Sequence, residues 1–258
     1  MSEDGNHSEP RVGLVTGGAR GIGKAVCVAL AQDGLSVVVA DLLAEEAQAT
    51  AEELRGLGVD AIGIPVDVAD SEAVSACVAA SVDRFGKVDV LVNCAGWDDL
   101  MLFVDTDETL WDRIIEINYK GPLRFAHLLA PGMTERGWGR IVNIGSDAGR
   151  VGSSLESVYS GAKGGIIAFS KTLARELARS GVTVNIVCPG PTDTEFLREV
   201  VERQGDADKV IRAMVSGVPM KRLAQPAEVA AAVRFFARED AGYITGQTLS
   251  VSGGLTMA

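Results

Sequence analysis

Short apolar runs alternate with amphipathic stretches along almost the whole chain. The runs predict seven strands, which read V-G-L-V-T, L-S-V-V-V-A, A-I-G-I-P-V, V-D-V-L-V-N, R-I-V-N-I-G, V-T-V-N-I-V-C-P and T-L-S-V-S. Between them, apolar residues recur at helical spacing, which predicts helices over residues 24–32, 45–55, 72–85, 108–136, 156–180 and 226–238. A polar segment over 193–216 is also helix-prone, and we expect the helix over 108–136 to break near 121–122 and 131–132, where glycine meets proline.

Strands that alternate with helices in this way are typical of a parallel sheet covered by helices on both faces. We therefore predict a single-domain α/β protein, a doubly wound Rossmann fold with a seven-stranded parallel sheet, over residues 11–258. The polar residues 1–10 are expected to form a disordered tail. In such a sheet, ligands bind beyond the C-terminal ends of the strands, so the residues that follow each strand are the first candidates for function.

Composition excludes several classes of function. The 258 residues carry a formal net charge of −11, which argues against a nucleic-acid partner or an anionic membrane surface. The 4 cysteines are widely spaced and there are only 2 histidines, so we expect neither a disulfide framework nor a metal site. The sequence has no apolar signal stretch near its start and no membrane-length apolar run. We expect a soluble cytoplasmic protein.

The first strand leads into a glycine-rich turn, in which Gly17, Gly21 and Gly23 precede a helix. Such a turn lets the backbone approach a diphosphate and points the N-terminus of the helix at it. Asp41 ends the next strand, twenty residues after Gly21, where a carboxylate can bind the adenosine ribose and repel a 2′-phosphate. Asp41 therefore favours NAD over NADP. Arg20 favours the opposite choice, because its guanidinium could bind a 2′-phosphate. Alternatively, Asp41 is an ordinary turn carboxylate and Arg20 a solvated surface charge.

Later strand ends carry further candidates. Asp67 follows the third strand and is expected either to border an adenine pocket or to cap the next helix. The small residues around Ala95 and Gly96 would let a flat ligand approach the backbone.

Tyr159 and Lys163 lie four residues apart on a predicted helix, and Ser146 ends the strand before it. An ammonium beside a phenol favours the phenolate, so we expect Lys163 to lower the pKa of Tyr159 and make it a general base near neutral pH. Taken alone, the Tyr–Lys pair could equally be an ordinary pair on a helix surface.

Taken together, these motifs resemble the short-chain dehydrogenase/reductase family over essentially the whole chain after the tail. Three of the matching motifs are the turn over 16–23, N-C-A-G over 93–96 (with Cys94 where the family often has asparagine), and the turn at 189–190. The other matching residues are the family's catalytic tetrad, in order: Asn118, Ser146, Tyr159 and Lys163.

The resemblance implies NAD(P)-dependent interconversion of a secondary alcohol and a ketone by a homotetramer. It implies that Asn118 holds a water that leads protons outward from Lys163. The residues expected to bind the cofactor are Gly17, Arg20, Gly21, Ile22, Gly23, Asp41, Asp67, Val68, Asn93, Ala95, Gly96, Tyr159, Lys163, Pro189, Gly190 and Thr192. The residues expected to line the substrate pocket are Trp97, Asp147, Arg150, Ser153, Leu155 and Pro191, with the segment 192–215.

Substrate and cofactor are left with alternatives. Stretches over 93–98, 146–154, 187–194 and around 244–257 are similar to 2-hydroxycyclohexanecarboxyl-CoA dehydrogenases, which implies NAD and a 2- or 3-hydroxyacyl-CoA as substrate. The chain is similar, more loosely, to 3-oxoacyl-[acyl-carrier-protein] reductases, which generally use NADPH. Acidic residues near the expected pocket, Asp98, Asp99 and Asp147, make an acidic carrier protein a less natural partner. A third alternative is a catalytically dead, cofactor-binding regulatory module, although all four tetrad positions are intact.

Overall fold

Seven parallel strands form one sheet at the centre of the protein. The computed structural model describes residues 10–257, so most of the predicted tail lies outside the described residues. The strands run in the spatial order β3-β2-β1-β4-β5-β6-β7, and every neighbouring pair is parallel. They are β1 (Val12–Thr16), β2 (Ser36–Asp41), β3 (Ala61–Pro65), β4 (Val90–Asn93), β5 (Gly139–Ile144), β6 (Val182–Pro189) and β7 (Thr248–Val251). The predicted doubly wound sheet is confirmed.

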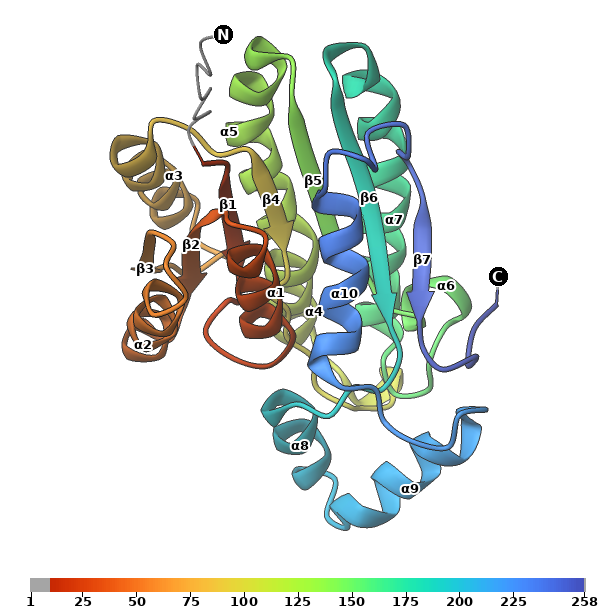
Figure 1. The fold of residues 1–258 in the computed structure, drawn as a ribbon. Helices are drawn as coiled ribbons and strands as arrows, with labels where there is room; N and C mark the ends of the chain where they lie inside the picture. Colours follow the sequence, from red (N-terminus) through yellow and green to blue (C-terminus); the bar gives the residue numbers. More distant parts are fainter. Residues whose placement is uncertain (1–9, 258) are drawn as a thin grey trace, which may run out of the picture.

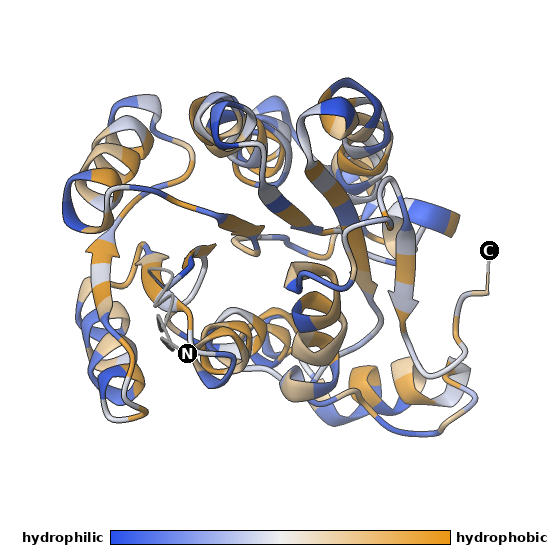
Figure 2. Ribbon diagram, turned by 45° about the horizontal axis from the view of Figure 1, so that its top comes forward, coloured by the Kyte–Doolittle hydropathy of each residue, from blue (hydrophilic) through white to orange (hydrophobic). Residues whose placement is uncertain are grey.

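Helices cover both faces of the sheet (Figures 1 and 2). One face packs against α1 (Gly21–Gln32), α2 (Ala44–Arg55) and α10 (Pro226–Ala237), which bury their apolar sides in one core cluster. The other face packs in a second cluster against α3 (Ser71–Phe85), α5 (Gly121–Arg136) and α7 (Ser157–Leu177). The five inner strands, β2, β1, β4, β5 and β6, are rich in apolar residues because both of their faces are buried, whereas the edge strands β3 and β7 are only partly buried. No helix within residues 10–257 is both long and apolar enough to cross a membrane.

The remaining elements lie near the C-terminal ends of the strands or follow a helix. They are η1 (Phe103–Asp105), α4 (Glu108–Ile115), the π-helical turn η2 (Glu116–Lys120), α6 (Ala148–Val151), η3 (Ala178–Ser180), α8 (Glu195–Glu202) and α9 (Ala207–Gly217). In Figure 1, α8 and α9 stand apart from the helical layers, beyond the strand ends.

The sequence misplaced some helix boundaries. The expected break at 131–132 is wrong, because α5 continues through Pro131 to Arg136 and its neighbours Ala130 and Met133 are held in the core. The break expected near 121–122 is instead the π turn that ends at Lys120. The segment 193–216 divides into α8 and α9, and α6 was not predicted.

The order of the strands reverses between β1 and β4, which opens a crevice at their C-terminal ends. Side chains at these ends fix the loops that leave the sheet. The hydroxyl oxygen of Thr16 accepts hydrogen bonds from the backbone N–H groups of Cys94 and Ala95, at 3.0 and 3.1 Å. Asn93 donates to Oδ1 of Asn143 on the neighbouring strand at 2.7 Å. The loop after β4 is therefore tied to β1, and β4 itself to β5.

Candidate active site

A cavity of about 720 Å³ occupies this crevice. Its lining comes from the glycine turn, the ends of β2 and β3, the loops after β4, β5 and β6, helix α7, and α8. Most of the residues expected to bind a cofactor lie along it, as do Trp97, Asp147, Ser153 and Pro191 of the expected substrate set. A single cavity thus joins the two groups of residues that the sequence singled out.

The glycine turn has no room for a side chain at Gly17 or Gly23. A Cβ on Gly23 would lie 1.9 Å from the carbonyl oxygen of Gly17, and one on Gly17 would lie 2.8 Å from Cα of Ala95. Gly17 also has a φ of +66°, in the left-handed region that favours glycine. Arg20 at the N-cap of α1 makes no side-chain cap, so the first N–H groups of the helix are left for another acceptor. These features fit a nucleotide diphosphate.

Asp41 and Asp67 lie at the neighbouring strand ends. The Asp41 carboxylate accepts hydrogen bonds from the backbone N–H of Ala19 at 2.9 Å and of Leu43 at 3.0 Å, which fixes it beside the turn. Asp67 accepts from the N–H of Ala69 at 2.9 Å and lines the cavity. Asp70, not Asp67, caps α3, so the cap interpretation of Asp67 is wrong.

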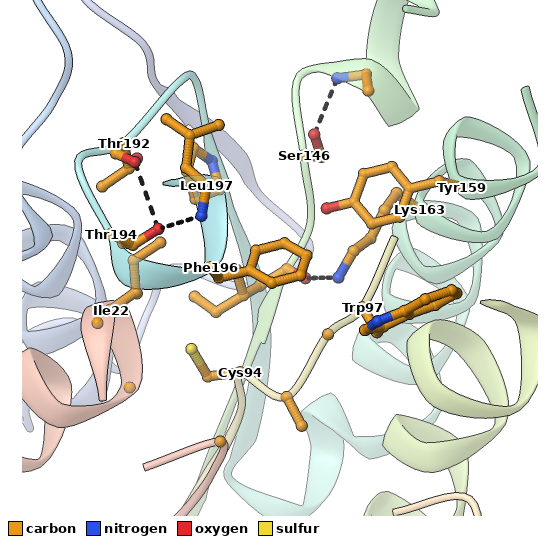
Figure 3. A pocket seen from close by; sticks show the side chains of 18 of the residues that line it. Ile22, Cys94, Trp97, Ser146, Tyr159, Lys163, Thr192, Thr194, Phe196 and Leu197 are labelled. Carbon is orange, nitrogen blue, oxygen red and sulfur yellow. Dashed lines mark hydrogen bonds between the residues drawn. The ribbon is translucent and has the colours of Figure 1, made fainter. Parts of the chain in front are cut away.

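Ser146, Tyr159 and Lys163 meet at the opposite end of the cavity, as Figure 3 shows. Ser146 follows β5, and the other two side chains come from successive turns of α7. The Lys163 ammonium is buried and donates to the carbonyl oxygen of Ile144 at 2.9 Å, and it lies 5.5 Å from the centre of the Tyr159 ring. A proton donor, a hydroxyl and a cation therefore share one site.

The pKa of Tyr159 does not move in the expected direction. Burial raises it well above its ordinary value, and Glu156 and Asp98 raise it further, against a smaller lowering by the Ser146 hydroxyl. Burial lowers the pKa of Lys163 to about 8. The expectation of a lowered pKa for Tyr159 is wrong for the protein groups alone, because desolvation of the phenolate and the two nearby carboxyls dominate. These groups keep Tyr159 protonated, which suits a proton donor.

Asn118 lies in the π turn, buried, and its side chain bonds backbone groups of Trp97 and Ile114. Its amide nitrogen donates to the carbonyl oxygens of Trp97 at 2.6 Å and Ile114 at 3.0 Å, and its oxygen accepts from the N–H of Trp97 at 3.2 Å. Asn118 thus fixes the backbone of Trp97, whose ring lies under the Arg113 guanidinium at 3.8 Å. Its oxygen keeps a second lone pair, so the water that Asn118 is expected to hold stays a prediction.

Two other expected site residues have structural contacts in place of cavity contacts. Arg150 donates to the hydroxyl of Ser250 on β7 at 2.6 Å, and that hydroxyl donates to Asp147. Arg150 is therefore directed towards β7 and does not line the cavity. Asn93 likewise binds Asn143, as described above, and does not line the cavity.

Asp98 is a buried carboxyl beside the site. It is 3% exposed and neither oxygen has a hydrogen-bond partner of normal geometry. Burial, together with Glu156, raises its pKa to about 8. A raised pKa in the folded state means that its contribution to stability is present below about pH 4 and is lost as the pH rises towards 8.

We expect Asp98→Asn to stabilise the protein increasingly over this range, because the amide carries no charge to bury. The gain in melting temperature over the wild type should be at least about 2 °C larger at pH 8.5 than at pH 4.5. Thermal unfolding at a series of pH values measures it, with Asp112→Asn, on the exposed face of α4, as the control. A gain that does not change with pH would contradict the raised pKa.

Helix α8 covers the cavity and is joined to neighbouring segments by two ion pairs. At its start Thr194 accepts from the N–H of Leu197 at 3.1 Å, and Phe196 and Leu197 face the cavity (Figure 3). Further along, Glu199 pairs with both terminal nitrogens of Arg20 in the glycine turn. Beyond its end, Arg203 pairs with Asp99 at 3.2 Å. The segment 192–215 is expected to line the substrate pocket, and its helix α8 forms a cover over the cavity.

Some lining residues were not singled out from the sequence. They are Arg113, Glu156, Leu255 and Thr256, among others. Glu156 lies three residues before Tyr159 on one helix face, a spacing that could have indicated it. Leu255 and Thr256 carry no such signal, because only the pairing of β7 with β6 brings them to the cavity.

Comparisons with known proteins agree with this geometry. The family model described as enoyl-(acyl carrier protein) reductase matches residues 17–256. The short-chain reductase protein NovJ of Streptomyces niveus is 41% identical over 96% of this chain and 94% of its own. The 3-oxoacyl-[acyl-carrier-protein] reductase FabG of Vibrio cholerae is 39% identical over 96% of this chain and 98% of its own.

A solved structure is also similar. It is a variant of the actinorhodin polyketide ketoreductase with NADPH, at a TM-score of 0.90 and 40% sequence identity, and the match covers 95% of this chain and 97% of that one.

Proposed function

The chain belongs to the short-chain dehydrogenase/reductase family, and we propose that it interconverts a 3-oxoacyl thioester and the matching 3-hydroxyacyl thioester. It is an NAD(P)-dependent oxidoreductase acting on CH–OH groups. The observation that carries the substrate proposal is a cavity with Ser146, Tyr159 and Lys163 at one end, the glycine turn at the other, and an apolar cover between them.

The chemistry follows from the three side chains. When bound, the nicotinamide supplies or accepts the hydride. In reduction Tyr159 donates its proton to the carbonyl oxygen while the carbonyl carbon gains a hydride, so that C=O becomes CH–OH. In oxidation the Tyr159 phenolate takes the proton from the hydroxyl group. Ser146 donates a hydrogen bond to the same oxygen and stabilises its developing charge. The buried Lys163 ammonium stabilises the phenolate that remains after transfer.

The lining supports an acyl substrate. Phe196, Leu197, Met214, Leu255 and Val151 give the covered side an apolar surface. Burial of an acyl chain against such side chains is favourable by about 25 cal/mol per Å². The names of relatives support the same class, since they include 3-oxoacyl-[acyl-carrier-protein] reductases and an acetoacetyl-CoA reductase of Allochromatium vinosum, 38% identical over 96% of this chain and 99% of its own.

The acidic residues that argued against a carrier-linked substrate do not present free charge at the mouth. Asp98 and Asp147 are buried, at 3% and 4% exposure, and Asp99 pairs with Arg203. These three residues therefore present no exposed, unpaired carboxylates that would repel a CoA thioester or an acyl carrier protein.

A narrower candidate is oxidation of 2-hydroxycyclohexanecarboxyl-CoA. All four stretches that resemble dehydrogenases of that substrate, 93–98, 146–154, 187–194 and the one around 244–257, contribute residues to this one cavity. The stretches include Trp97, Asp147, Ser153 and Pro191, which are expected to line the substrate pocket. This supports it as a second candidate within the same reaction class.

The choice of nucleotide depends on the end of the cavity beside the glycine turn. We propose a preference for NAD(H), because the Asp41 carboxylate is fixed there by two backbone N–H groups and Arg20 is already paired with Glu199. A 2′-phosphate would be repelled by the Asp41 carboxylate, and the guanidinium of Arg20 would not be free to bind it. The related ketoreductase carries NADPH, so NADP(H) is the alternative that must be tested.

Oxidation of reduced nicotinamide with acetoacetyl-CoA tests the substrate class. We expect turnover with acetoacetyl-CoA that exceeds turnover with a simple ketone such as cyclohexanone. Reduction of NAD with 2-hydroxycyclohexanecarboxyl-CoA tests the narrower candidate in the same assay. Turnover of the simple ketone alone would refute the thioester proposal.

Titration of the protein with NADH and NADPH tests the nucleotide. We expect NADH to bind at least about tenfold more tightly, which corresponds to about 1.4 kcal/mol. The difference should shrink as salt is added, because it arises from charges near the surface. Tighter binding of NADPH would reverse the assignment.

A further inference from the structure

The ion pair between Arg20 and Glu199 joins the glycine turn to the helix that covers the cavity. Nη1 of Arg20 contacts Oε1 of Glu199, and Nη2 contacts Oε2 at 3.2 Å, so the two planar groups meet at two points. This is the geometry in which a guanidinium also binds a phosphate. Both residues line the cavity. The pair therefore uses the donors that a phosphate at this place would need.

Arg20 is outnumbered by carboxylates. Glu199, Asp41 and Glu195 all interact electrostatically with its guanidinium, and all three line the cavity with it. The other cations of the lining are engaged elsewhere: Arg113 lies over the ring of Trp97, and Lys163 is buried against Ile144. At the Asp41 end, one cation thus faces three carboxylates.

We propose that Glu199 is a determinant of nucleotide choice, acting by holding the guanidinium of Arg20 in a two-point ion pair and so withholding it from a 2′-phosphate. This inference rests on the proposed nicotinamide-dependent function. It assigns a role in reading the adenosine ribose to a residue of the cover, about 160 positions away from the strand end that carries Asp41. A nucleotide that drew Arg20 to itself would also release α8 from the glycine turn.

The effect is modest because the pair is partly exposed. The side chains of Arg20 and Glu199 are 39% and 47% exposed, and pairs of this kind contribute little to stability. A 2′-phosphate therefore faces competition for Arg20 and repulsion by Glu199, and neutralising Glu199 removes both of these contributions. We expect Glu199→Gln to tighten NADPH binding about fivefold and to change NADH binding less than about twofold.

The test is a titration of both nucleotides into four variants and the wild type at low salt. Glu199→Gln is compared with Glu202→Gln, which removes the same charge from an exposed position on the same helix. Arg20→Gln and the double variant Arg20→Gln/Glu199→Gln show whether the gain needs the guanidinium. Of the two single Glu→Gln variants, only Glu199→Gln is expected to bind NADPH more tightly than the wild type. The double variant is expected to bind NADPH no more tightly than Arg20→Gln does.

Three outcomes would overturn the inference: no gain for NADPH, an equal gain for both nucleotides, or the same gain in Glu202→Gln. An equal gain would mean that Glu199 only holds the cover. Tighter binding of NADPH than of NADH by the wild type would refute the proposed NAD(H) preference. The change in NADPH affinity between the wild type and Glu199→Gln would still decide the role of Glu199. Binding of neither nucleotide to the wild type would refute both.

Discussion

Replacing Tyr159 with phenylalanine is expected to lower kcat by about 10³-fold or more and to leave nucleotide binding nearly unchanged. The phenol is the proton donor with access to the substrate oxygen, and general acid catalysis typically contributes about 10²–10⁴-fold. The ring itself remains, so its packing beside Lys163, whose ammonium lies 5.5 Å from the ring centre, is kept.

Steady-state kinetics with acetoacetyl-CoA and a nucleotide titration measure the two quantities separately. Tyr243→Phe is the matched control, since Tyr243 is fully exposed and lies away from the cavity. Turnover by Tyr159→Phe close to that of the wild type would remove Tyr159 from the mechanism. Loss of nucleotide binding along with turnover would indicate a structural role instead.

Replacing Gly23 with alanine is expected to abolish tight nucleotide binding and to destabilise the fold. The new Cβ would lie 1.9 Å from the carbonyl oxygen of Gly17 and 2.6 Å from its carbon, and these backbone atoms cannot rotate away as a side chain could. Overpacking costs about 1–3 kcal/mol, so the melting temperature should fall by about 4–10 °C. The displaced turn should weaken NADH binding by more than about tenfold.

Gly161→Ala is the control for this variant. Gly161 lies within α7, and a Cβ there would meet nothing within 4 Å. Helix propensity favours alanine over glycine by about 1 kcal/mol, so this variant should be slightly more stable than the wild type. Equal effects of the two alanines would mean that crowding at the turn is not the cause. Thermal unfolding and NADH titration decide between these results.

The sheet was predictable because its signals are local. Each strand is an apolar run followed by a turn, and β5 and β6 are almost completely buried, as their sequences indicate. The positions of Ser146, Tyr159 and Lys163 followed from the same local pattern. The π turn over Glu116–Lys120 could not be predicted in this way, because the bonds of Asn118 to Trp97 join segments about twenty residues apart.

Side-chain direction was harder to predict than position. The resemblance implied that Asn93 binds the cofactor and that Arg150 lines the substrate pocket, but each has a partner on a strand that directs it away from the cavity. The pKa of Tyr159 was misjudged for a related reason. The sequence displays the nearby lysine, whereas burial and the carboxyl of Asp98 become visible only in three dimensions.

The order in which the chain is synthesised gives β7 a particular importance. Strands β1 to β6, with the tetrad residues, precede it in the sequence, yet Ser250 on β7 holds Asp147 and Arg150, and Leu255 and Thr256 complete the cavity. During translation a domain's earlier parts can begin to fold before the later ones emerge. The nascent protein would therefore carry its catalytic side chains long before it has a finished substrate wall. Its activity would begin only when β7 has docked against β6.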